Sequence, residues 1–165
     1  MAVKPVVLLP ARVLSEPARL VGDDDVRGLV TDLIDTMRAS PACVGLAAPQ
    51  IGVPLRVFVL DVSAHPKTTD AHGLVALIDP VVEAVAGRAR GREGCMSVPD
   101  LTADVVRAER VVVRGLTPDG EERVVETSGF EARAIQHEID HLDGLVILDR
   151  VASLATDVFR RKVYR

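Results

Sequence analysis

Apolar positions recur in two different patterns along the chain. Between the acidic run at 23–25 and Pro41 they are three or four residues apart, which predicts an amphipathic helix that ends before the proline. A second helical pattern starts at Phe130 and ends at Gly144, because glycine commonly stops a helix. A further short helix is expected at 154–161.

The middle of the chain is rich in β-branched residues, which favours strands. The strand-like runs are residues 55–62, 74–85, 105–116 and 123–127. Pro-Asp-Gly at 118–120 has the composition of a turn and predicts a hairpin from the last two runs. Segments 43–52 and 64–73 are expected to be loops, and segment 1–22, which contains three prolines, is expected to lie extended on the surface.

The order helix, strands, helix indicates an α+β fold in which a helix packs against antiparallel strands. A length of 165 residues with 48% hydrophobic residues fits a single domain, 1–165. The net charge of −4 and the aromatic content of 2% offer neither a basic face nor stacking platforms, so direct nucleic-acid binding is not expected. We find no apolar run of membrane or signal-peptide length, which predicts a cytoplasmic protein without membrane contact.

The sequence His-Glu-Ile-Asp-His at 137–141 carries the strongest chemical signal. Residues four apart on a helix lie on one face, so His137 and His141 can bind the same metal ion. Glu138 lies beside them, where its carboxylate can take a proton from water. So short a motif also arises by chance, but this one falls within a segment that is already predicted to be helical.

A catalytic ion needs a third protein ligand besides the two histidines. Zinc endopeptidases with this motif take it from later in the chain, where the remaining carboxylates are Asp143, Asp149 and Asp157. The absence of any later histidine points upstream, to Cys95, which follows Gly94. A thiolate with two imidazoles suits Zn²⁺ or Fe²⁺ better than Mg²⁺ or Ca²⁺. Alone, Cys95 would read as a small buried hydrophobic residue.

Gln50 ends a run of small residues, 45–49. Small residues permit close approach of a substrate, and a carboxamide there could donate a hydrogen bond to a developing oxyanion. A simple surface turn is the alternative interpretation of this segment.

Three segments together resemble the motifs of the peptide deformylase family. The family shows Gly-x-Gly-hydrophobic-Ala-Ala-x-Gln, Glu-Gly-Cys-hydrophobic-Ser and Gln-His-Glu-x-Asp-His, in this order. The corresponding segments here are Cys43–Gln50, Glu93–Ser97 and Gln136–His141. The likeness extends through the linking regions and covers nearly the whole chain.

The resemblance implies an enzyme that removes the formyl group from N-formylmethionyl peptides emerging from ribosomes and releases formate. It also implies antiparallel strands around a central helix that carries the His-Glu pair. The implied roles are metal ligation by Cys95, His137 and His141, general base catalysis by Glu138, and an oxyanion hole formed by Gln50 and the Met96 N–H. Family members commonly use one Fe²⁺ ion, for which Zn²⁺, Ni²⁺ or Co²⁺ can substitute.

The formyl group is small and the methionine side chain is apolar, so the resemblance also guides the choice of pocket residues. We expect Gly45 and Gly94 to line the formyl site, and Val44, Phe130 and Ala134 to line the methionine pocket. Core packing is the alternative role for Phe130. Arg133 stands where the family is often apolar, and it is expected either to face solvent or to reach over the pocket mouth.

Four further positions depart from the family pattern. They are Cys43 for glycine, Met96 for leucine, Asp79 for asparagine and Thr102 for arginine. These changes bear on substrate preference rather than on the reaction. Three alternatives therefore stay open: a zinc endopeptidase, a non-catalytic relative that only binds peptides, and a deformylase for a specialised substrate such as a small formylated metabolite.

Overall fold

The computed structural model describes residues 2–69 and 71–162 and contains two antiparallel sheets. The five-stranded sheet has the order β1 (Gly45–Ala47), β2 (Val57–Leu60), β3 (Val75–Ala86), β6 (Arg110–Leu116), β7 (Glu122–Ser128). The three-stranded sheet has the order β4 (Ala89–Cys95), β5 (Val98–Arg107), β8 (Val158–Arg160). This arrangement confirms the predicted α+β class.

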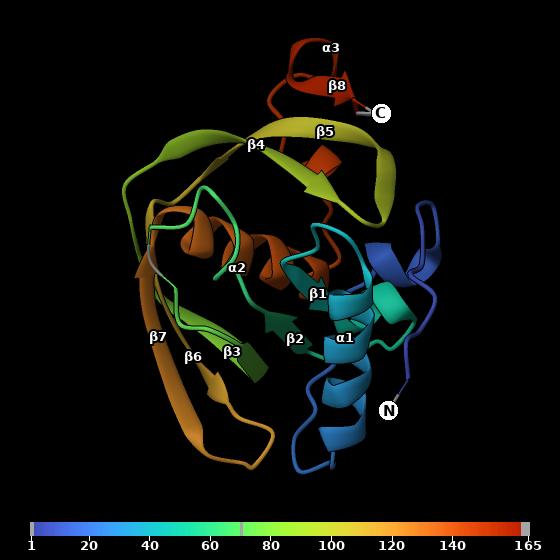
Figure 1. Cartoon of the computed structure of the whole chain (residues 1–165), viewed down its shortest axis with the longest axis vertical. Helices are drawn as coiled ribbons and strands as arrows, with labels where there is room; N and C mark the ends of the chain where they lie inside the picture. The colour runs from blue at the N-terminus through green and yellow to red at the C-terminus, as the bar shows by residue number, and fades with distance from the viewer. Residues whose placement is uncertain (1, 70, 163–165) are drawn as a thin grey trace.

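The helices are α1 (Arg27–Ala39), α2 (Gly129–Leu142) and α3 (Leu154–Asp157), with 3₁₀ turns η1 (Arg12–Ser15), η2 (Ala48–Ile51) and η3 (Ile147–Asp149). Helix α2 comes late in the chain, yet it runs between the five-stranded sheet and the β4–β5 hairpin (Figure 1). Helix α1 packs on the other side of β1 and β2. Among the described residues, no helix is both long enough and apolar enough to cross a membrane.

Strand β2 is buried on both of its faces. Because side chains alternate along a strand, Phe58 and Leu60 face one way and Val57 and Val59 the other. The first pair belongs to the apolar cluster that includes Ile135 of α2, and the second pair belongs to the cluster that contains much of α1. The sheet therefore holds both long helices, and α2 is fixed against its inner face.

The predicted strand 105–116 is in fact two strands, because the chain leaves one sheet and enters the other at Ala108 and Glu109. Gln136 of α2 compensates the break: its amide accepts a hydrogen bond from Ala108 N at 3.0 Å and donates one to Ala108 O at 2.9 Å. A side chain thus takes the place of a strand partner. A continuous apolar run in the sequence could not reveal that a side chain replaces a strand partner at this point.

Other predictions were wrong in part. Segment 43–52 is not only a loop, since it contains β1 and η2, and strand β4 was missed. The helix expected at 154–161 ends at Asp157, after which β8 pairs with β5. Segment 1–22 forms η1 and is tied to the body of the fold by a bridge between Arg19 and Leu55; its first residue lies outside the described part.

Helix α2 ends as predicted, in a glycine cap. Leu145 N donates to Asp140 O at 2.8 Å and Gly144 N donates to His141 O at 3.3 Å, which is the Schellman arrangement. Gly144 has a φ of +79°, and a Cβ there would lie 2.8 Å from the backbone carbon of Glu16. Conformation and space both require glycine at this position.

Replacing Gly144 by alanine should therefore destabilise the protein more than the same change at Gly120. Both residues have positive φ, but a Cβ at Gly120 would meet nothing within 4 Å. We expect the free energy of unfolding to fall by about 1 kcal/mol in Gly120→Ala and by about 3 kcal/mol in Gly144→Ala. Urea unfolding of the two variants checks this; equal losses would show that the contact with Glu16 carries no cost.

Candidate metal centre

Three potential metal ligands from two distant segments meet where the β4–β5 hairpin faces helix α2. Cys95 ends β4, while His137 and His141 lie one turn apart on α2. One donor atom of each lies within 4.8 Å of the others, and the Cys95 sulfur is 3.4 Å from His141 Nε2. The sequence-based expectation that these three residues come together agrees with this geometry.

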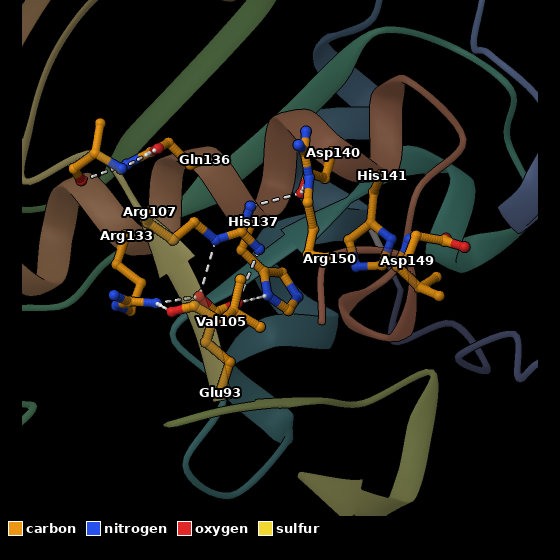
Figure 2. Close-up of polar contacts among 12 residues, drawn as sticks. Glu93, Val105, Arg107, Arg133, Gln136, His137, Asp140, His141, Asp149 and Arg150 are labelled. Atoms are coloured by element: carbon orange, nitrogen blue, oxygen red, sulfur yellow. Dashed lines mark hydrogen bonds and ion pairs between the residues drawn. The ribbon is translucent and has the colours of Figure 1, made fainter. Parts of the chain in front are cut away.

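The two histidines are held differently. His137 Nδ1 is 2.9 Å from Glu93 Oε1, a contact that fixes the ring (Figure 2). His141 is 1% exposed, and burial lowers its pKa well below the usual value. The His141 ring is therefore neutral, which is the form that binds metals. Within the described part of the chain, His141 Nδ1 has no hydrogen-bond partner.

Glu93 holds a buried negative charge beside the centre. Its carboxylate accepts two hydrogen bonds from Arg107, each 2.9 Å long, and one from Arg133 at 2.7 Å (Figure 2). Burial by itself raises the pKa of Glu93, but the hydrogen bonds from Arg107 and His137 outweigh it, so the pKa falls below the ordinary value. The carboxylate stays ionised and can orient His137.

The charge pattern continues away from the centre. Arg107 also pairs with Asp140 at 2.5 Å, and Arg150 binds the same carboxylate through two hydrogen bonds of 2.8 and 2.9 Å. Positive and negative groups thus alternate from Arg133 to Arg150. The sequence motif contains Glu93 but indicates no role for it, and nothing in the local sequence around Arg107 distinguishes that residue.

Glu138 differs from Glu93 in that no arginine of the described chain hydrogen-bonds to it. It is 4% exposed, its Oε1 has no hydrogen-bond partner among the described residues, and burial raises its pKa to about 7. Gly45 makes this position possible, because a Cβ there would lie 2.8 Å from Glu138 Oε2. A carboxyl group with such a pKa can both accept and return a proton near neutral pH.

Gln50 lies in η2 and is 2% exposed, so the interpretation of this segment as a surface turn was wrong. Its Oε1 accepts a hydrogen bond from Ala47 N at 3.0 Å, which orients the amide. Its Nε2 donates to Ser97 Oγ at 3.2 Å and toward the Cys95 sulfur at 3.7 Å. The donor end of the amide therefore faces the metal centre.

A cavity of about 310 Å³ opens beside these residues. Its walls include all the residues expected to bind substrate, namely Val44, Gly45, Gly94, Phe130, Arg133 and Ala134, together with Gln50, Cys95, Met96, His137 and Glu138. His141 lies behind the wall. Three cationic residues were not anticipated there: Lys67, Arg92 and Arg161.

Two side chains in the wall have contacts that the sequence did not suggest. Phe130 stacks on His65 of the loop before β3, with ring centroids 4.0 Å apart. Arg133 does not point into solvent: its side chain is 11% exposed and binds Glu93 and the carbonyl oxygens of Ala89 and Val105 at 2.7 and 2.9 Å. Its guanidinium supports the wall.

Two of the departures from the family pattern, Cys43 and Asp79, differ in their backbone conformation. The positive φ of 59° belongs to Ala42 rather than to Cys43. The Cys43 thiol donates to Gly45 O at 3.2 Å, and burial raises its pKa to about 12, so it remains protonated. Asp79 does have a φ of 50°, and its carboxylate accepts hydrogen bonds from the backbone of Val21 and Gly22.

Comparisons with known proteins agree with this geometry. The polypeptide deformylase family matches residues 3–157. Peptide deformylase 1 of Bacillus subtilis is 40% identical over 159 residues, covering 95% of each chain, and the peptide deformylase of Acidothermus cellulolyticus is 45% identical over 154 residues, covering 92% of this chain and 80% of its own.

Solved structures show the same likeness. The peptide deformylase of Ehrlichia chaffeensis superposes with a TM-score of 0.84 at 33% identity, covering 93% of this chain and 90% of its own. The enzyme of Thermus thermophilus gives a TM-score of 0.80 at 39% identity, covering 90% and 86%. With a match along nearly its whole length in both sequence and fold, this chain belongs to the polypeptide deformylase family.

Proposed function

We propose that this chain deformylates the N-formylmethionyl ends of nascent proteins, in the cytoplasm and close to the ribosome, with Cys95, His137 and His141 as its metal ligands. Metal-dependent deformylation of peptides is the general function of its family. The observation that carries the residue assignment is the meeting of one sulfur and two imidazoles within 4.8 Å, next to the buried carboxyl group of Glu138.

The donor set fits a divalent transition metal. One thiolate and two neutral imidazoles bind Fe²⁺, Zn²⁺, Ni²⁺ or Co²⁺ well, and we propose Fe²⁺ as the native ion. When bound, the ion acts as a Lewis acid that polarises the formyl carbonyl and lowers the pKa of water. Among the described residues, the buried Oε1 of Glu138 beside this centre has no hydrogen-bond partner, so it can accept a hydrogen bond from a water bound there.

Glu138 moves the proton in the proposed reaction. It accepts a proton from the attacking water, whose oxygen forms a bond to the formyl carbon. It then gives the proton to the departing amine as the carbon–nitrogen bond breaks, so that formate and a free amino terminus result. Its pKa of about 7 suits both transfers.

The developing oxyanion receives hydrogen bonds from Gln50 Nε2 and the Met96 N–H in this proposal. Removal of one such donor typically costs roughly 3–4 kcal/mol of transition-state stabilisation. The backbone N–H of Ala47 donates a hydrogen bond to Gln50 Oε1, so the Nε2 donor is oriented before the substrate arrives. The methionine side chain packs against Val44, Phe130 and Ala134, while Gly45 and Gly94 leave room for the formyl group.

In the described part of the chain, the endopeptidase alternative finds no third ligand after His141. Each carboxylate that follows His141 is engaged elsewhere: Asp143 pairs with Arg56 at 3.0 Å, Asp149 accepts a hydrogen bond from Val146 N, and Asp157 pairs with Arg90. Within residues 2–69 and 71–162, the only group of three or more such side chains close enough to hold a metal ion contains Cys95 instead.

Cys95→Ala should abolish stoichiometric metal binding, because two imidazoles do not make a stable site. Metal analysis after anaerobic purification checks this. Asp149→Asn is the matched control, since asparagine can keep the bond from Val146 N, and it should retain one ion per chain. Full metal content in Cys95→Ala would contradict the ligand assignment.

Glu138→Gln should lower formate release from formyl-Met-Ala-Ser by about 10²- to 10⁴-fold, because glutamine has the same shape but cannot take the proton. Metal content should be unchanged. A variant as active as the parent would place the base elsewhere, and a parent that releases no formate would support the non-catalytic alternative.

Glu138 should also give the metal-free protein a distinctive pH dependence. Its pKa of about 7 in the fold exceeds the ordinary 4.5, so between these values the folded state holds a proton that the unfolded state has lost. Its contribution to stability is thus present below pH 4.5 and lost as the pH rises to 7. In urea unfolding with a chelator present, Glu138→Gln should stabilise the chain more at about pH 8 than at about pH 5; an equal effect at both would contradict the raised pKa.

A further inference from the structure

A guanidinium group from the end of the described chain lies in the cavity wall. Arg161 directly follows β8, and its backbone N–H donates to Asp100 O at 2.9 Å, which ties this segment to β5. Its side chain is half-buried and lines the same cavity as Cys95 and Glu138. The group therefore faces the space in which the substrate is proposed to bind.

The position of this guanidinium depends on Gly94. A Cβ on Gly94 would clash with Arg161 Nη2 and would lie 3.3 Å from Arg161 Cζ and 3.8 Å from Thr102 Cγ2. The guanidinium thus rests on bare backbone, one residue before Cys95 in the chain. The short side chain of Thr102 lies beside it, where a longer one would compete for the same room.

The other arginines of the cavity wall already have partners. Arg92 binds Asp104 at 2.7 Å and lies over the ring of Phe159, and Arg133 binds Glu93. Arg161 differs from them: in the described part of the chain, its guanidinium has neither an ion pair nor a hydrogen bond. Its five donors remain available to a ligand, and their planar arrangement matches a carboxylate.

We infer that Arg161 binds a carboxylate of the peptide substrate and thereby determines which peptides are preferred. The inference rests on the proposed function, which places the formyl group at the centre beside Cys95. Because the guanidinium lies next to Gly94, the second and third residues of an extended peptide come within its reach. The carboxylate is either an acidic side chain at one of these positions or the free terminus of a short peptide.

Formate release by the metal-loaded enzyme tests this on a matched set of peptides. The neutral reference is formyl-Met-Ala-Ser amide; the others carry Glu at the second or third position, or have a free terminal carboxylate in place of the amide. We expect the parent enzyme to prefer at least one carboxylate peptide by about fivefold in kcat/KM, mainly through KM, and less so at high salt. The peptide that is preferred identifies the source of the carboxylate.

Arg161→Gln should remove this preference, so that the ratio to the neutral peptide approaches one. Arg160→Gln is the matched control, because it removes the same charge one residue earlier, outside the cavity wall; it should keep the preference. Equal kcat/KM for all peptides with the parent enzyme, or a preference that survives in Arg161→Gln, overturns the inference. If even the neutral peptide releases no formate, the proposed function itself has failed.

Discussion

The charge of Glu93 is the constraint on which the proposed metal centre depends. An ionised carboxylate out of water costs several kcal/mol unless it is paired and hydrogen-bonded. Here Arg107 of β5, together with Arg133 and His137 of α2, supplies the compensation. One carboxylate on β4 therefore holds the hairpin to the helix and sets the direction of the His137 ring, one of the three proposed ligands. Removing any partner would leave charge stranded inside the molecule.

The two glutamates beside the centre show how different surroundings give chemically identical groups different pKa values. Glu93 accepts hydrogen bonds from two guanidinium groups and stays charged. Glu138 is equally buried, but no cation among residues 2–69 and 71–162 hydrogen-bonds to it, and its pKa is about 7. Pairs of carboxyl groups whose pKa values are driven apart commonly divide structural and proton-transfer tasks. Glu93 can orient the His137 ring, and Glu138 is able to exchange a proton. Gly45 contributes by leaving space for it.

The sequence predicted those features that depend on short-range pattern. The hydrophobic periodicity located α1 and α2, and the four-residue spacing of His137 and His141 predicted that both lie on the same face of one helix. Features that depend on partners distant in the chain were missed. Strand β4 is polar and contains two glycines, so only its pairing with β5 makes it a strand. The same holds for β8, and no local signal joins Arg107 to Glu93.

The β4–β5 hairpin packs on a small apolar cluster, to which Val98, Ala103, Val105 and Ile147 belong, whereas the opposite face of α2 shares a much larger one with the main sheet. Amide hydrogens of the hairpin should consequently exchange by partial opening, long before those of β2. In the proposed ligand set, an ion that bridges Cys95 to α2 would bind only the closed arrangement, so its affinity would add to closure by mass action. Loss of the ion would then loosen one layer of the molecule and leave the rest folded.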